Sequence, residues 1–313
     1  MIFDMGDLEV LKQNDTYKPC LDLGGRLLND KCYMSIVVTN KCNRKCAYCI
    51  NSSTDGKSDL PLNKALANIR KAHDNLGIKE CVILGGEPTL YPDLIELVRS
   101  LSAMGFEKII MTSNGVELHR PLIDSLIDAG LTHLNVSVHN DKGLWNTIGL
   151  SEMQAIYDVV NHRIPVRVNT NVWKGNHDTL YSLDSWLFEL QSCSDTIRVS
   201  NLIHKDSFSV NPKNSDDALE RIHTDEYYNE LFDSLIEKYA RRMSLIHNHT
   251  ALGFVDYTLI PTKSAIIINR NIDSKVSEQV CENDLSHLKV NTIKCLVTGD
   301  LSLSWNANNI VNI

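Results

Sequence analysis

Long apolar runs are missing from this chain of 313 residues. No run approaches the roughly 20 residues that a membrane-spanning helix needs, so we expect no membrane span. The amino-terminal residues 1–7 have neither the basic start nor the apolar stretch of a signal peptide. These two absences lead us to expect a cytoplasmic protein.

An excess of positive charge is missing as well. The formal net charge is −8, whereas proteins that coat nucleic acids usually present a basic face. The charge therefore argues against a nucleic-acid-coating surface, although a nucleotide or a peptide still fits a local pocket.

Cysteine, in contrast, is plentiful, with nine residues. In a reducing compartment such thiols are more often metal ligands or buried small hydrophobes than disulfides. Three of them, Cys42, Cys46 and Cys49, are spaced C-x3-C-x2-C just past the apolar run 35–39. A loop with this spacing can turn three sulfurs towards one point, as an iron–sulfur cluster requires. Structural zinc would need a fourth ligand, and the nearest histidine, His73, lies in a helical pattern.

Apolar runs of about five to eight residues alternate with amphipathic segments of about 11 to 16 residues from residue 35 onwards. This βα pattern predicts an α/β fold with a parallel sheet. The expected strands are 35–39, 81–84, 108–111, 133–139, 166–172 and 196–203. The expected helices are 62–76, 94–104, 121–129, 153–160, 180–190 and 224–243.

After about residue 250 the pattern changes to short apolar runs, which predict a small antiparallel extension. The expected strands there are 254–260, 265–269, 287–297 and 301–305, and Thr298-Gly299-Asp300 is expected to form the turn between the last two. The organisation that we expect is an irregular segment over 1–34, a main domain over 35–243 and a carboxyl-terminal cap over 244–313.

Polar motifs follow several of the expected strands, and ligands bind at the carboxyl ends of strands in parallel α/β sheets. Gly85-Gly86-Glu87-Pro88 directly follows a strand. Its glycines would let the backbone approach a ligand closely, and its carboxylate can accept hydrogen bonds from an ammonium group. Ser113 and Asn114 follow the next strand and Ser137 lies near the end of the one after it, and all three are short polar groups suited to binding a small ligand.

Polar side chains also alternate with valines along the expected strand 166–172. Arg167 and Asn169 share one face of this strand, and Val166 and Val168 share the other. Buried polar groups need partners, so a polar face turned into the domain favours a ligand there.

The cysteine spacing, with Tyr48 before the third cysteine, resembles the defining motif of the radical S-adenosylmethionine (SAM) superfamily. Gly85-Gly86-Glu87-Pro88 looks like the family element that holds the amino group of SAM. Ser113-Asn114-Gly115, the run Val136-Ser137-Val138-His139 and the run around Asn169 resemble elements of the branch that includes the molybdenum-cofactor cyclase. His139 stands where that branch usually has aspartate.

The resemblance implies a partial (β/α)6 TIM-like barrel with a twitch-like carboxyl-terminal extension. It implies that Cys42, Cys46 and Cys49 hold a [4Fe-4S] cluster whose open iron is chelated by SAM. It further implies that Glu87, Asn114, Ser137 and Asn169 bind SAM. In this family the cluster cleaves SAM reductively to a 5′-deoxyadenosyl radical, which abstracts a hydrogen atom from the substrate.

A second cluster is a separate question that the resemblance raises. Twitch-type and SPASM extensions hold an auxiliary iron–sulfur cluster through cysteines, and this chain has Cys281 and Cys295 in the corresponding region. Two thiolates seldom suffice for a cubane cluster. Cys20, Cys32 or Cys193 could add a ligand, but no spacing requires it, so a cap without a cluster is the favoured interpretation.

The substrate stays open at this point. A small molecule or nucleotide is favoured, a ribosomal-peptide maturase is the alternative, and a reductase, flavodoxin or ferredoxin would supply the electron. A non-catalytic iron–sulfur electron carrier is the remote alternative. Such a carrier has no need of the motifs at Gly85–Pro88 and Ser113–Gly115, so these motifs favour the enzyme.

Overall fold

The structure is a computed structural model. It describes residues 33–46, 49, 56–140, 147–173, 176–201, 225–239, 243–249, 254–259, 265–271 and 292–302. Residues 1–32 of the expected irregular segment 1–34 lie outside these residues, as do Tyr48 and Cys281, whereas Tyr33 and Met34 belong to the first strand. Cys20 and Cys32 are within 1–32.

The described strands form one 11-stranded sheet in the order β11-β10-β1-β2-β3-β4-β5-β6-β9-β8-β7. The strands are β1 (Tyr33–Val37), β2 (Glu80–Leu84), β3 (Lys108–Ser113), β4 (His133–Ser137), β5 (Val166–Val172), β6 (Thr196–Asn201), β7 (Met243–His249), β8 (Phe254–Leu259), β9 (Ala265–Asn271), β10 (Thr292–Cys295) and β11 (Leu301–Ser302). The helices are α2 (Leu62–Leu76), the 3-10 turn η2 (Pro88–Leu90), α3 (Leu94–Met104), α4 (Arg120–Ala129), α5 (Leu150–Val160), α6 (Leu180–Leu190) and α8 (Asp225–Tyr239).

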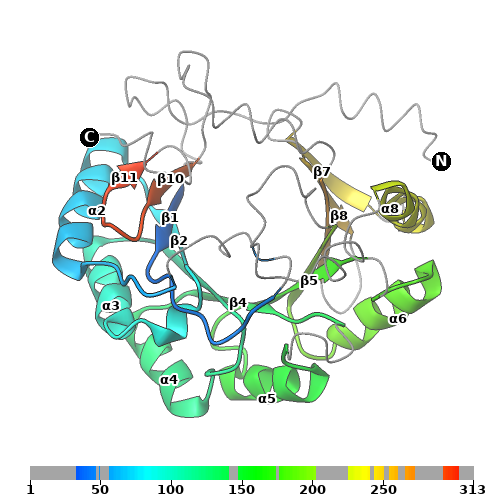
Figure 1. The fold of residues 1–313 in the computed structure, drawn as a ribbon, viewed down its shortest axis with the longest axis horizontal. Helices are drawn as coiled ribbons and strands as arrows, with labels where there is room; N and C mark the ends of the chain where they lie inside the picture. Colours follow the sequence, from blue (N-terminus) through cyan, green and yellow to red (C-terminus); the bar gives the residue numbers. More distant parts are fainter. Residues whose placement is uncertain are drawn as a thin grey trace.

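Strands β1 to β6 pair parallel in chain order, as the alternation of strands and helices predicts. They curve into an arc, and helices α2 to α6 lie along its outer side (Figure 1). The sheet is open within the described residues, because β11 and β7 are its two edges. The expectation of a partial TIM-like barrel is confirmed.

Helices α2, α3 and α4 each end at a glycine. Gly77 ends α2 with φ 65° and Gly105 ends α3 with φ 95°. Both are in the left-handed region, which glycine enters without the steric cost that a Cβ brings. These sharp stops let the chain turn back into β2 and β3, and so place the ends of successive strands on one side of the sheet.

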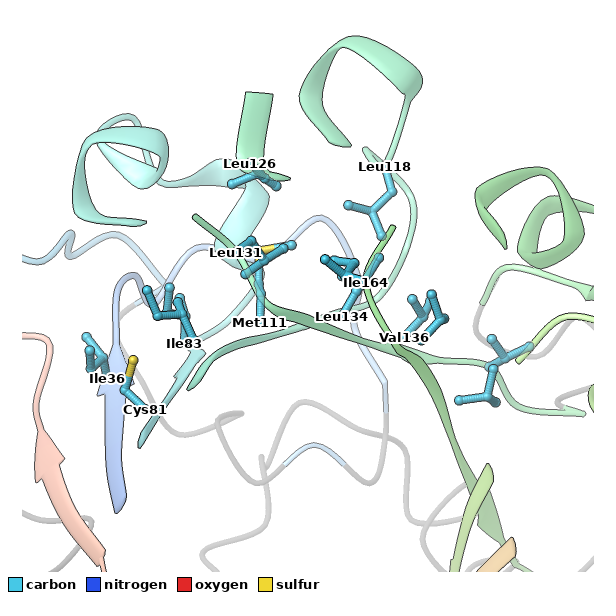
Figure 2. Packing of buried hydrophobic residues seen from close by; sticks show 14 of the residues in the cluster. Ile36, Cys81, Ile83, Met111, Leu118, Leu126, Leu131, Leu134, Val136 and Ile164 are labelled. Carbon is cyan, nitrogen blue, oxygen red and sulfur yellow. The ribbon is translucent and has the colours of Figure 1, made fainter. Parts of the chain in front are cut away.

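The core lies between the sheet and its helices. Figure 2 shows side chains from β1 to β4 packed towards the helical layer. Met34, Ile36, Ile83 and Met111 are fully buried. Because side chains alternate along a strand, the neighbours of these residues point to the opposite, concave side of the sheet.

The carboxyl-terminal strands differ in part from the expected appendage. β8 and β9 are antiparallel neighbours, as expected, and β10 and β11 form the predicted hairpin. β7, which was not predicted, pairs antiparallel with β8. However, β9 also pairs parallel with β6, and β10 pairs parallel with β1. The strands after residue 243 therefore continue the main sheet at both of its ends. None of the described helices has the length and apolar character needed to cross a membrane.

Candidate functional site

The predicted site motifs meet at the carboxyl ends of neighbouring parallel strands. The cysteine loop follows β1, Gly85–Pro88 follows β2, and Asn114 follows β3. Ser137 is the last residue of β4, and its register partner on β5 is Asn169. The fold thus brings together groups that lie up to about 130 residues apart in the chain.

Gly85 and Gly86 provide a close approach to the protein backbone, and their approach to a ligand stays a prediction. The amide of Gly86 donates to the carbonyl of Thr39 at 2.7 Å, and the amide of Glu87 donates to the carbonyl of Lys41 at 2.8 Å. A Cβ at Gly85 would lie 2.5 Å from the Thr39 oxygen, and one at Gly86 would overlap the Lys41 oxygen. The glycine pair therefore fixes the chain just before the first cysteine, a role that the sequence did not reveal.

The carboxylate of Glu87 is buried, with the residue only 1% exposed, and it accepts hydrogen bonds from protein groups. Its Oε1 accepts from the amide and hydroxyl of Thr89, at 3.2 and 2.8 Å, and from the hydroxyl of Ser113 at 2.7 Å. Its Oε2 accepts from the amide of Asn114 at 2.7 Å. A carboxylate accepts about four hydrogen bonds, and these four contacts already connect the end of β2 to the end of β3. Contact of Glu87 with an ammonium group stays a prediction.

Ser113 is turned inward and is 2% exposed. Besides donating to Glu87, its hydroxyl accepts from the amide of Gly115 at 3.0 Å. Both hydrogen bonds stabilise the turn after β3. Ser113 therefore supports the site, and ligand binding by its hydroxyl stays a prediction.

Asn114 connects the turn after β3 to the cysteine loop. Its Nδ2 donates to Oδ1 of Asn43 at 2.7 Å and lies 4.0 Å from the sulfur of Cys42. Asn43 in turn donates from Nδ2 to Oε1 of Glu117 at 3.3 Å. The backbone amide of Arg44 also donates to the Cys42 sulfur, at 3.4 Å. Hydrogen bonds of this kind orient metal ligands.

Cys42, Cys46 and Cys49 lie in one loop, and none of them forms a disulfide. The amide of Cys49 donates to the carbonyl of Cys46 at 3.1 Å. Desolvation by the surrounding chain raises the pKa of the Cys42 thiol above its ordinary value, against the hydrogen bond from the Arg44 amide. Among the described residues, no three His, Cys, Asp or Glu side chains are gathered as a metal-binding group.

The donor chemistry of this loop nevertheless fits a four-iron cluster with one open iron. Three cysteine thiols of one loop are the ligand type that such clusters take, and Cys42 already receives the hydrogen bonds expected of a ligand sulfur. Metal binding supplies free energy that can gather such ligands.

Asn169 provides an observation that points to a ligand. Its side chain lies on the concave side, because the neighbouring Thr170 faces the helices and accepts from Nε1 of Trp186 at 3.0 Å. Oδ1 of Asn169 is buried and has no hydrogen-bond partner within the described residues. A buried amide oxygen without a donor is costly, so this atom fits a hydroxyl or ammonium group of a bound molecule.

Cationic side chains share this concave side. Arg167 precedes Asn169 on the same face of β5, and Arg198 on β6 is the register partner of Asn169. Burial, with a smaller contribution from the charges of Lys108 and Arg167, lowers the pKa of His133 below its ordinary value. Sequence reasoning missed Arg198, although its alternation with Ile197 and Val199 repeats the pattern of β5.

His139 lies where β4 leads into the following loop. It is 5% exposed, and its Nδ1 accepts from the backbone amide of Asn171 at 3.0 Å. The ring also contacts Trp173 edge-on, at 5.9 Å between centroids. This histidine therefore ties the end of β4 to β5.

Cys295 lies in the core, away from the cysteine loop. It is fully buried on β10, and burial raises its pKa to about 12. Its register partner is Ile36, whose side chain packs on the helical side of the sheet. Cys193 is equally buried. Cys281 lies outside the described residues, so the auxiliary cluster stays a prediction.

Comparison with known proteins agrees with these motifs. The family model of the radical SAM superfamily matches residues 36–142. A probable GTP 3′,8-cyclase of Sulfurisphaera tokodaii is 29% identical over 176 residues, which are 54% of this chain and 55% of that protein. The GTP 3′,8-cyclase of Listeria monocytogenes is 33% identical over 172 residues, covering 49% and 50% of the two chains. The chain thus spans about half the length of the curated relatives it matches.

Solved structures support the fold. SuiB of Streptococcus suis, in a crystal structure bound to S-adenosylmethionine, has a TM-score of 0.57 at 15% identity, and the match covers 90% of this chain and 62% of SuiB. Coproporphyrinogen III oxidase from Escherichia coli, which its description calls a radical SAM enzyme, has a TM-score of 0.50 at 14% identity, covering 77% and 57%. Residues 36–142 are thus similar to the radical SAM superfamily, in agreement with the motifs at Cys42–Cys49 and Gly85–Pro88.

Proposed function

We propose that this protein is a radical SAM enzyme whose substrate is an anionic small molecule, with a purine nucleotide as the first candidate. The observation that carries the proposal is the contact between the three motifs. Hydrogen bonds connect the cysteine loop to Gly86 and Glu87, Glu87 to Asn114, and Asn114 back to the cysteine loop. An electron carrier would need the cysteines but not the hydrogen bonds that connect them to the other two motifs.

Cys42, Cys46 and Cys49 would hold the cluster, and Asn114, Ser137 and Asn169 would contact SAM. When bound, the reduced cluster and SAM supply a carbon-centred radical that removes a hydrogen atom from the substrate. The chain's own residues hold and orient the bound molecules. Glu87 keeps the turn after β3 against the cysteine loop, and the unpartnered Oδ1 of Asn169 would accept a hydrogen bond from the cofactor.

Two observations support an anionic substrate. Arg167 and Arg198 are on the concave faces of adjacent strands, and guanidinium groups bind phosphate and carboxylate groups well. The matched part of the chain resembles enzymes named for their action on GTP. A nucleoside triphosphate is therefore the first substrate to test, because it carries negative charge and because the relatives are named for their action on GTP.

The proposal extends to the rest of the molecule. Residues 35–243 would bind the cluster and SAM, and residues 244–313 would cap the substrate. The segment 1–34, whose last two residues lie in β1, would lead into the barrel. A flavodoxin, ferredoxin or reductase would supply the electron. Because thiol ligands and strong reductants fit a reducing compartment, the reaction would take place in the cytoplasm.

Reconstitution under anaerobic conditions tests the proposal. The protein is loaded with iron and sulfide, reduced with dithionite and supplied with SAM, with and without GTP. We expect about four irons per chain and release of 5′-deoxyadenosine. Cys46→Ala should abolish both, whereas Cys193→Ala, the same substitution at a buried thiol outside the site, should leave both unchanged.

The outcomes separate the alternatives. Iron binding without SAM cleavage would support an electron carrier instead, and zinc in place of iron would refute the proposal. A GTP-dependent product would identify the substrate class. SAM cleavage that no nucleotide stimulates, but that a peptide does, would move the assignment to a peptide-modifying enzyme.

A further inference from the structure

The cysteine loop leaves and rejoins the barrel at a neck, made of residues 38–41 on one side and 58–60 on the other. The amide of Asn40 donates to the carbonyl of Ser58, and the amide of Leu60 donates to the carbonyl of Val38, both at 2.8 Å. These hydrogen bonds accompany an isolated antiparallel bridge between Thr39 and Asp59. The backbone thus brings the two ends of the loop together.

Asp59 adds side-chain contacts across this neck. Its Oδ1 accepts from the hydroxyl of Thr39 at 2.6 Å, and its Oδ2 forms an ion pair with Nζ of Lys41. The Thr39 hydroxyl also accepts from the amide of Lys41 at 3.1 Å. Burial raises the pKa of Asp59, but the hydrogen bonds from Lys41 and Thr39 outweigh it, and the net pKa is below the ordinary value. The carboxylate is therefore held in its charged form.

The residues that Asp59 contacts are those that lead into the first cysteine. Lys41 directly precedes Cys42, and its carbonyl accepts from the amide of Glu87. Thr39 is fully buried, and its carbonyl accepts from the amide of Gly86. The chain just before the cysteines is thus fixed on two sides, by the glycine motif on one and by Asp59 on the other.

We propose that Asp59 is a positioning residue for the cluster: it closes the neck of the cysteine loop and thereby slows loss of the metal group. The inference rests on the proposed function. Closing a loop restricts the conformations that its residues can adopt. The cysteines would then separate less readily from one another, and a bound cluster would be lost more slowly. Residues that orient metal ligands without touching the metal commonly change its retention about tenfold or more.

The test compares Asp59→Asn with Asp300→Asn. Asp300 makes the same kind of contacts, with Nζ of Lys64 at 2.7 Å and the hydroxyl of Thr298 at 2.9 Å, but in the turn between β10 and β11. Both variants are reconstituted, counted for iron, and exposed to a chelator while the visible absorbance of the cluster is followed. We expect Asp59→Asn to lose its cluster about ten times faster than wild type, and Asp300→Asn to lose it at the wild-type rate.

Further variants distinguish positioning from general destabilisation. Thermal unfolding of the metal-free proteins should show similar decreases for the two Asn variants. Lys41→Arg, which keeps the ion pair, should retain the cluster, and Lys41→Met combined with Asp59→Asn should be no worse than Asp59→Asn alone. Equal rates of cluster loss in Asp59→Asn and wild type would refute the inference. Failure of wild type to bind iron would instead refute the proposed function.

Discussion

Glu87 shows how a single residue can act through protein contacts at a site where a ligand contact was expected. Its carboxylate is nearly inaccessible and receives donors from Thr89, Ser113 and the amide of Asn114. Removing one partner of a buried charged hydrogen bond is costly, because the other group stays buried. A Glu87 variant would therefore lose function through loss of structure, independently of any contact between Glu87 and SAM.

We predict that Glu87→Gln destabilises the metal-free protein by about 1–3 kcal/mol. The amide group would turn an N–H towards either the Asn114 amide or the Thr89 amide, and neither can accept a hydrogen bond. Urea unfolding measures the change. Glu96→Gln, at an exposed ion pair with Arg99, serves as the control and should cost less than about 1 kcal/mol. An unchanged stability of Glu87→Gln would mean that the carboxylate is free for a ligand.

At the scale of helices and strands, local signals predict most of the barrel. The 3.6-residue period of α2 indicates which face is buried, and Gly77 marks where the helix ends. The boundaries of strands are less accurate, and β1 begins and ends two residues earlier than expected. Strand pairing after residue 243 could not be predicted, since β9 and β10 meet strands far away in the chain.

The same distinction applies to the site. Sequence spacing identified the cysteines and the motif at Gly85–Pro88, because both are short and local. It could not show that Gly86 packs on Lys41 or that Asp59 closes the loop, since these contacts join separate segments. It did give the correct side for Asn169, because alternation along a strand fixes the face of each residue.

Gly86→Ala tests the contact between the glycine motif and the cysteine loop. The new Cβ would overlap the Lys41 carbonyl oxygen, and because backbone cannot move aside cheaply, we expect a loss of about 3 kcal/mol in the free energy of unfolding. Iron content after reconstitution should fall as well, because the loop is displaced. The control is Gly56→Ala, where φ is 66° but nothing lies within 4 Å of the new Cβ, and where we expect a loss of about 1 kcal/mol. Equal losses would show that the close approach is unimportant.

At the scale of the whole molecule, one sheet contains strands from both the expected main domain and the expected carboxyl-terminal cap. β10 lies beside β1, and its turn contacts α2 through Lys64 and Asn68, which donates to the carbonyl of Gly299 at 2.9 Å. β9 lies beside β6 at the other end of the parallel strands. A substrate cap built from these residues would share its hydrogen bonds with the barrel, so the described strands form one packing unit.

One packing unit should unfold in one transition, and Ile293→Ala tests this. Ile293 on β10 is fully buried, so truncation removes core contacts and leaves a cavity, at a cost of about 2–4 kcal/mol. Ile83→Ala, in β2 at the centre of the barrel, provides the comparison. If the carboxyl-terminal strands are integral to the sheet, both substitutions shift the same urea transition, and circular dichroism and tryptophan fluorescence report the same midpoint. Fluorescence reports on the barrel through Trp173 and Trp186, which are buried beside β5. Two separate transitions, with Ile293→Ala shifting only one of them, would establish an independent cap instead.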